Sequence, residues 1–154
     1  MIRQTAVIAH VPLLLLLLIL ITRPASAQSV RAYVLHNPAV TQETIGTTIC
    51  IPGWTRSARP PSSYARRVKI ALVRELDIPE DMLGDFELDH RVPLSLGGAP
   101  YEPANLELQP WDEASEKDRK EACLARAVCD GRLALDEARR RIWSDWRNVG
   151  AGCD

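Results

Sequence analysis

The chain has 154 residues, of which 46% are hydrophobic, and its 19 basic and 20 acidic residues nearly balance. Such a balance excludes a generally basic nucleic-acid-binding protein, in which an excess of Lys and Arg attracts phosphates over the whole surface. The four cysteines form no Cys-x-x-Cys pair, which excludes a zinc ribbon or a zinc knuckle.

Residues 1–27 are predicted to form a secretory signal peptide. Arg3 is followed by an apolar run over residues 11–21, and residues 25–27 (Ala-Ser-Ala) supply the small residues of a cleavage site. A membrane-spanning helix needs about 20 consecutive apolar residues, so we expect cleavage rather than membrane anchoring. Cleavage leaves 127 residues with 17 basic and 20 acidic side chains, and the product is expected to be secreted or periplasmic, without membrane contact.

The remaining chain has the size of a single domain. Residues 28–52 show little periodicity and are interpreted as an N-terminal arm that is held down near Cys50. His36 lies in this arm, and a surface or packing role is expected for it because no acid or Cys stands at metal-ligand spacing. Residues 53–154 form the predicted functional domain.

The cysteine count predicts disulfides. An even number of cysteines in an exported chain favours two disulfides over free thiols. Four cysteines allow three pairings, and the sequence alone does not choose among them. We favour Cys50 with Cys129 and Cys123 with Cys153.

A loop and a helix are expected after the arm. Residues 53–63 contain two consecutive prolines and are predicted to be extended. A helix should follow to about Leu76, because apolar residues recur there at helical spacing, with Ser62 or Ser63 as its N-cap.

The same region is basic, since no acidic residue occurs between Gly53 and Arg74. A local basic face can meet phosphates even when the whole chain is not basic. A solvated helix face with ordinary surface arginines accounts for the same pattern, so both interpretations remain open. The residues predicted to bind nucleic acid are Arg56, Arg59, Arg66, Arg67 and Lys69.

The second half of the chain is predicted to contain strands and helices. Residues 86–88 and 106–109 are expected to be short strands, and the prolines and glycines between them require a long, shaped loop rather than a two-residue turn. Asp112 is expected to cap a helix that runs to about Val128, and a last helix should span residues 136–146. The four tryptophans are assigned to core packing rather than to base stacking. We therefore predict an α+β fold with additional helices, stabilised by disulfides.

The stretch ELDHRVPLSLGGAPYEPANLELQP (residues 87–110) resembles the HNH endonuclease family, which has a ββα-metal site. This resemblance implies a ββα-metal core that ends in the helix after the second strand. The resemblance rests on an ordered set of residues, which are Asp89-His90, Val92-Pro93-Leu94, Gly97-Gly98, Asn105-Leu106 and Lys117-Asp118.

A wider resemblance extends over nearly the whole predicted mature chain. Small exported bacterial proteins of the HNH type combine the same motif with stretches similar to residues 48–64 (TICIPGWTRSARPPSSY) and 128–146 (VCDGRLALDEARRRIWSDW) of this chain. Members of that group are known mostly as predicted HNH proteins. The wider similarity therefore bears on fold and location more than on activity.

Phosphodiester hydrolysis gives these residues a role. An imidazole whose pKa lies near 6.5 can take a proton from the attacking water at neutral pH. A divalent cation can neutralise the charge on the phosphate and on the leaving 3′ oxygen. His90 is the predicted general base and Asp89 the first metal ligand. By resemblance to the family, Asn105 holds the loop and helps to orient the histidine.

The helix departs from the family pattern. Many HNH proteins carry a His or Asn there as a further metal ligand, but counting on from Asn105 this place falls near Ala114, which cannot bind a metal. Asp118 shares a helical face with Ala114 and is the predicted second ligand, with Glu113 as the next candidate. Oxygen ligands of this kind favour Mg²⁺ or Mn²⁺ over Zn²⁺. Lys117 is predicted to lie by the scissile phosphate as a catalytic residue, with a solvent-facing helix lysine as the alternative.

Taken together, the residues predict an exported, disulfide-bonded, metal-dependent endonuclease that acts on DNA in preference to RNA. The alternative is a noncatalytic extracytoplasmic binding or structural protein that keeps an HNH-like scaffold. A third possibility is a disulfide-stabilised structural domain without a site, but the charged neighbours of His90, which include Glu87 and Arg91, suit a site better than a core. No partner protein is implied.

Overall fold

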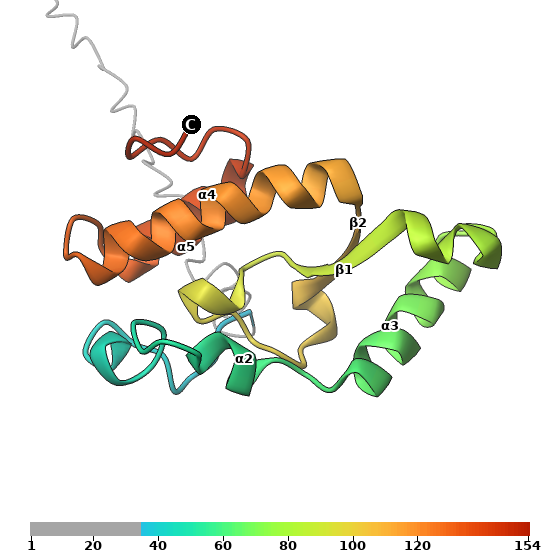
Figure 1. Ribbon diagram of the computed structural model, residues 1–154, viewed down its shortest axis with the longest axis horizontal. Coiled ribbons are helices and arrows are strands. Elements are labelled where there is room, and N and C mark those ends of the chain that lie inside the picture. The colour runs from blue at the N-terminus through green and yellow to red at the C-terminus, as the bar shows by residue number, and fades with distance from the viewer. Residues whose placement is uncertain (1–34) are drawn as a thin grey trace, which may run out of the picture.

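The computed structural model describes residues 35–154. The predicted signal peptide, residues 1–27, and the start of the predicted arm, residues 28–34, lie outside the described residues. The described chain forms four α-helices and a two-stranded antiparallel sheet, an α+β architecture (Figure 1). In chain order the elements are α2 (Trp54–Ala58), α3 (Ser62–Glu75), β1 (Phe86–His90), β2 (Leu106–Pro110), α4 (Trp111–Cys129) and α5 (Leu135–Asp145).

The two strands pair over their whole length, with Phe86 opposite Pro110 and His90 opposite Leu106. Both strands extend slightly beyond their predicted ends. The predicted long connection is confirmed, because residues 91–105 join the strands through short 3₁₀ turns. The helix α4 begins directly after β2 and packs against both strands, and Figure 1 shows it on the side of the sheet away from α2.

Asn105 holds the connection between the strands. Its buried side chain accepts a hydrogen bond from the N–H of Val92 at 2.8 Å and donates to the carbonyl oxygens of Val92 and Ala99 at 3.0 and 3.1 Å. Gly98 passes so close to this network that a Cβ atom there would lie 1.8 Å from the Val92 carbonyl oxygen. Only glycine fits at this position, which gives the second glycine of the motif a steric reason.

The main hydrophobic core lies between α4, α5 and the loops that cover them. Leu124 and Val128 of α4 pack with Ile142 of α5, and Val40 and Leu96 complete the cluster from the arm and from the loop between the strands. Ala138 and Ile142 are spaced four residues apart on one face of α5, and both are buried in this core.

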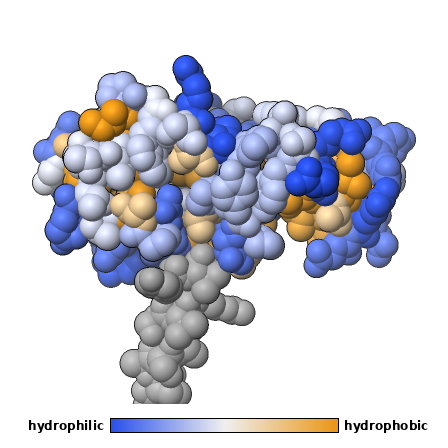
Figure 2. All heavy atoms as spheres, turned by 90° about the horizontal axis from the view of Figure 1, so that it is seen from below, coloured by the Kyte–Doolittle hydropathy of each residue, from blue (hydrophilic) through white to orange (hydrophobic). Residues whose placement is uncertain are grey.

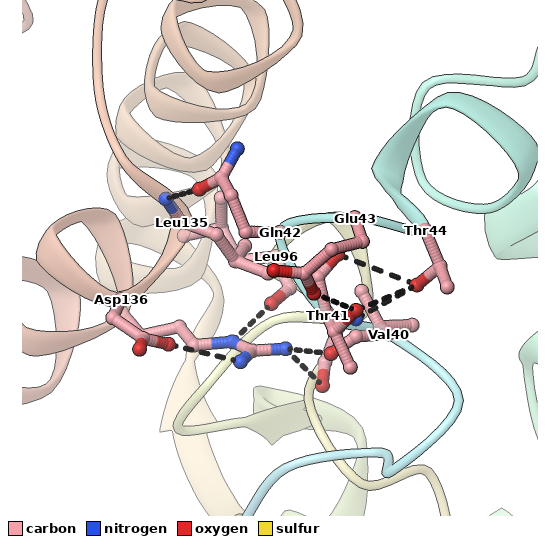
Figure 3. A network of polar contacts seen from close by, with 10 residues as sticks. Val40, Thr41, Gln42, Glu43, Thr44, Leu96, Leu135 and Asp136 are labelled. Atoms are coloured by element: carbon pink, nitrogen blue, oxygen red, sulfur yellow. Dashed lines mark hydrogen bonds and ion pairs between the residues drawn. The ribbon is translucent and has the colours of Figure 1, made fainter.

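Residues 35–52, the described part of the predicted arm, pack onto the rest of the domain. The buried side chain of Arg139 in α5 donates hydrogen bonds to the carbonyl oxygens of Leu96 and Val40, at 2.8 and 2.9 Å. Figure 3 marks these bonds beside the labelled Val40 and Leu96. One buried guanidinium thus ties the arm and the loop between the strands to α5.

Both predicted disulfides are confirmed. The Cys50–Cys129 bond ties the arm to the end of α4, and the Cys123–Cys153 bond ties the C-terminal segment to the same helix. Disulfides persist in oxidising compartments, so this pairing is consistent with an extracytoplasmic protein. Within residues 35–154, no helix has the length and apolar character needed to cross a membrane.

The assignment of all four tryptophans to the core is wrong for two of them. Trp54 and Trp146 pack against the core, but Trp111 and Trp143 are 51% and 45% exposed. One helical step of about 100° beyond the buried face of α5 turns Trp143 toward the solvent. Its ring there lies 6.0 Å from the guanidinium of Arg91.

The predicted serine and aspartate caps are also wrong. The helices α3 and α4 begin at Ser62 and Trp111, and their N-cap residues are Pro61 and Pro110, without a side-chain cap. The ring of each proline fixes φ, at −56° and −54°, which aligns the chain for the first helical turn. Asp112 instead lies in the first turn of α4, where its negative charge interacts favourably with the positive end of the helix dipole.

Candidate functional site

A polar pocket of about 110 Å³ lies where the end of β1 meets α4 and the residues around α2. The strand contributes Glu87, Asp89 and His90, and the helix contributes Asp118 and Glu121. The fold therefore brings the predicted second metal ligand, Asp118, into one pocket with the adjacent Asp89 and His90 of β1.

The His90 imidazole is almost fully buried, at 6% exposure. Its Nε2 atom lies 3.2 Å from the carbonyl oxygen of Pro100. Because a carbonyl oxygen only accepts, Nε2 carries the proton in this hydrogen bond and Nδ1 keeps the lone pair of the neutral ring. Burial lowers the pKa of His90, against the opposing effects of the Pro100 carbonyl and the Asp89 carboxylate. The ring is therefore neutral at neutral pH and able to accept a proton.

Asn105 acts on His90 only through the loop. Its hydrogen bonds go to the backbone of Val92 and Ala99, and the residue after Ala99 is Pro100, whose carbonyl oxygen bonds the imidazole. The asparagine thus fixes the segment that carries the histidine's partner. Asn105 directly precedes β2, and from there its side chain contacts the loop between the strands.

Lys117 lies beneath the pocket with 1% exposure, and the solvent-facing alternative is wrong. Its ammonium donates to Asp89 Oδ2 at 2.5 Å, to the His90 carbonyl oxygen at 2.8 Å and to Glu121 Oε1 at 2.8 Å. Burial works against the charge, but the carboxylates of Glu121 and Asp89 outweigh it and raise the pKa of Lys117. An ammonium has three hydrogen-bond donors, and all three are used here, so none remains for a phosphate.

The carboxyl groups of the pocket repel one another. Burial raises the pKa of Glu87 and of Asp118, and the Asp89 carboxylate raises both further. Burial also raises the pKa of Glu121 to about 7, in spite of Lys117. The acidic side chains here (Glu87, Asp89, Asp118 and Glu121) outnumber the basic side chains, which are Arg59 and Lys117. The surplus negative charge favours the binding of a further cation.

The donor set fits a hard divalent cation better than Zn²⁺. Among residues 35–154, no three acidic, His or Cys side chains already converge at metal-ligand spacing. Mg²⁺ is usually bound by one or two carboxylates, together with water and substrate phosphates, and does not need an all-protein cage. Asp89 and Asp118 line the same pocket and meet that requirement.

The two other helix positions considered from the sequence lie elsewhere. Ala114 is buried, and its methyl group is not part of the pocket lining. The carboxylate of Glu113 binds the guanidinium of Arg147 at 2.7 Å and does not line the pocket. Asp118, one turn beyond Ala114, is the candidate helix ligand from the sequence that lines the pocket together with Asp89.

The five predicted nucleic-acid-binding residues are spread along the chain around α2 and α3. Arg59 directly follows α2 and is the member of the set that lines the pocket. Arg56 lies on α2, and Arg66, Arg67 and Lys69 lie on α3. Figure 2 shows the face seen from below, with hydrophobic residues in small separate groups between hydrophilic ones.

Four polar residues of the pocket were missed from the sequence, namely Glu87, Ser95, Glu121 and Thr55. Glu87 stands two positions before Asp89 and shares its face of the strand, and Glu121 follows Lys117 by one helical turn, so both could have been found by spacing. Thr55 comes from α2, and no local pattern indicates that it lines the same pocket as residues of β1 and α4.

Comparison of the chain with protein-family models, with curated proteins and with solved structures finds no match.

Proposed function

We propose that this protein is a metal-dependent endonuclease that hydrolyses phosphodiester bonds in nucleic acid. The observation that carries the proposal is the meeting of Asp89, His90 and Asp118 in one polar pocket with Arg59 at its side. A neutral buried imidazole can act as the general base, two carboxylates can hold a divalent cation, and a guanidinium can bind a phosphate oxygen. DNA is the preferred substrate in the proposal, and RNA is the other substrate to be tested.

Each residue has one task in the proposed reaction. His90 Nδ1 removes a proton from a water molecule, whose oxygen attacks the phosphorus. The bond from phosphorus to the 3′ oxygen then breaks, and that oxygen takes up a proton from the solvent. Arg59 binds a non-bridging phosphate oxygen. Asp89 and Asp118 would hold Mg²⁺ or Mn²⁺, which when bound neutralises charge on the phosphate and on the leaving oxygen.

Lys117 is a positioning residue in this proposal and not a catalytic one. Its ammonium holds the Asp89 carboxylate and the His90 carbonyl oxygen, so it fixes the end of β1 from the protein side. Asn105 fixes the other side of the histidine through the loop. A general base held on both sides keeps its lone pair directed into the pocket.

An HNH-type ββα-metal core is part of the proposal. Its support is the order of two antiparallel strands and a helix, with the Asp-His pair at the end of the first strand and Asn105 beside the second. Asp118 takes the place of the helix ligand, one turn beyond Ala114. The proposed location is outside the cytoplasm, which the two disulfides favour.

The test is cleavage of supercoiled plasmid and of single-stranded RNA by the oxidised protein, with Mg²⁺ or Mn²⁺ or with a chelator. We expect metal-dependent nicking that falls by at least about 100-fold in His90→Ala, the usual loss on removal of a general base. The control is His36→Gln. His36 is the second histidine within residues 35–154 and does not line the pocket, so this variant should retain cleavage. Equal cleavage by His90→Ala and the wild type would contradict the proposal.

A noncatalytic binding protein is the second candidate, and one observation favours it. Lys117 already neutralises Asp89 at 2.5 Å, as an internal cation that needs no metal. A scaffold stabilised in this way would bind nucleic acid through Arg59 without cutting it. Saturable binding of an oligonucleotide, with no cleavage under Mg²⁺ or Mn²⁺, would support this candidate over the enzyme.

A further inference from the structure

A second pocket, of about 290 Å³, adjoins the polar one. Its walls come from the start of α3 and from the two strands, and most of its surface is apolar. The residues that make it apolar are Pro60, Tyr64, Ala65, Leu88 and Leu106. It will be called the apolar pocket.

The apolar pocket and the polar pocket share two residues. Arg59 and His90 line both of them, so the two pockets are neighbours across these side chains. A ligand group in the apolar pocket therefore lies next to the place where Arg59 would hold a phosphate. This continuity suits a molecule that carries an apolar group next to an anionic one.

One wall of the apolar pocket is held in place before any ligand binds. The hydroxyl of Tyr64 donates to the carbonyl oxygen of Tyr101 at 2.8 Å, and the two rings meet edge to face with centroids 5.1 Å apart. A fixed aromatic wall loses little entropy on binding a flat ring. The volume is close to the lower end of small-ligand pockets, about 300 Å³, and so suits a single ring system.

We propose that the apolar pocket receives one unpaired nucleobase of the substrate, next to the phosphate that enters the polar pocket. The inference rests on the proposed function and adds a substrate class to it, namely single-stranded or locally opened nucleic acid. Bases in a duplex are paired and stacked, so none can enter a pocket unless it leaves the stack. Apolar and aromatic walls accept the face of any base and give little sequence preference.

The test measures binding in a chelator, so that it does not depend on cleavage. The probe is a fluorescent strand of ten thymidine nucleotides, and its matched control is a strand of ten abasic nucleotides with the same charge. Fluorescence anisotropy should show at least about 5-fold tighter binding of the thymidine strand, the lower end of the contribution of one stacked base. A duplex of equal length should bind no better than the abasic strand.

Variants that fill the apolar pocket distinguish binding of a base in this pocket from binding of the strand elsewhere on the protein. Ala65→Leu adds a side chain inside the pocket, and Ala71→Leu makes the same change on an exposed position of the same helix. We expect Ala65→Leu to remove the preference for the thymidine strand and Ala71→Leu to keep it. Ser62→Leu and Ser63→Leu repeat the comparison at exposed positions, since Ser62 lines the pocket and Ser63 does not, in case Ala65→Leu fails to fold.

The outcomes distinguish this inference from the proposed function. Base-dependent binding that Ala65→Leu removes supports the apolar pocket, even if no metal yields cleavage and the enzyme proposal fails. Equal binding of the thymidine and abasic strands overturns the inference, and metal-dependent cleavage would still leave the enzyme proposal intact. Equal losses in Ala65→Leu and Ala71→Leu, or no binding to any strand, also overturn it.

Discussion

Replacement of Lys117 by methionine should strongly destabilise the protein, because Lys117 neutralises two poorly exposed carboxylates. The side chains of Asp89 and Glu121 are 14% and 13% exposed, and their contacts to the ammonium are 2.5 and 2.8 Å. Methionine keeps most of the apolar volume but removes the charge. Removal of one partner from a buried ion pair costs about 3–5 kcal/mol, so we expect a loss of this size at pH 8.

The loss should be smaller at pH 5.5, because the carboxyl groups can then take up protons. Burial already raises the pKa of Glu121 to about 7 in the presence of Lys117, and removal of the ammonium raises it further. Between the ordinary carboxyl pKa and this raised value, the folded state binds more protons than the unfolded state. The free energy of unfolding of the variant therefore falls as the pH rises through this window.

The assay is urea unfolding of the oxidised protein, followed by tryptophan fluorescence, at both pH values. With a slope of about 2 kcal/mol per molar urea, a loss of 3 kcal/mol lowers the midpoint by about 1.5 M. The control is Lys120→Met on the same helix, because Lys120 lies 3.8 Å from Asp154, whose side chain is 54% exposed. The control should lose less than about 1 kcal/mol. A similarly small loss for Lys117→Met at pH 8 would refute the reasoning.

Three further predictions concern the parts of the fold that support the site. Burial, and then the charge of Arg139, lower the pKa of His36 to about 4. Between pH 6.5 and 4 the unfolded chain therefore binds more protons than the folded chain, and the free energy of unfolding falls as the pH falls, by about 2 kcal/mol after a discount for partial exposure. Urea unfolding of His36→Gln should lack this dependence of stability on pH. Asn105→Ala leaves three buried backbone groups without their partner and should cost about 3 kcal/mol by the same assay, whereas a loss below 1 kcal/mol would show that the loop holds without it. Removal of the Cys50–Cys129 bond, whose cysteines are 79 residues apart, by alanine at both positions should cost about 4 kcal/mol from loop entropy, and an unchanged thermal midpoint would contradict this.

The strands and helices in the second half of the chain could be predicted because the sequence patterns that indicate them are local. The strands around residues 86–90 and 106–110 carry apolar alternation, the loop between them is marked by proline and glycine, and the apolar positions of α5 recur at helical spacing. The disulfide pairing was a preference among three and proved right. Local patterns thus give element type and order, which is enough to bring Asp89 near the helix that carries Asp118.

The environment of each side chain could not be predicted from these patterns. The sequence around Lys117 does not reveal whether this lysine is a buried counter-ion or lies on the surface. Its burial depends on contacts with β1, 28 residues earlier in the chain. Trp143 lies only one residue from a core position, yet it faces the solvent. Thr55 reaches the pocket from α2 through tertiary packing alone. Such contacts are set by how the elements pack, and the sequence of each element leaves them open.

The most direct test of the central claim compares two helix carboxylates in the rate of phosphodiester cleavage under Mg²⁺ or Mn²⁺. Asp118 lines the pocket beside Asp89, whereas Glu113 binds Arg147 outside it. Since charge stabilisation by a bound metal is worth several kcal/mol, Asp118→Asn should lower the cleavage rate by at least about 100-fold, and Glu113→Gln should leave it nearly unchanged. Undiminished cleavage in Asp118→Asn, or no cleavage by the folded wild-type protein with either metal, would contradict the account.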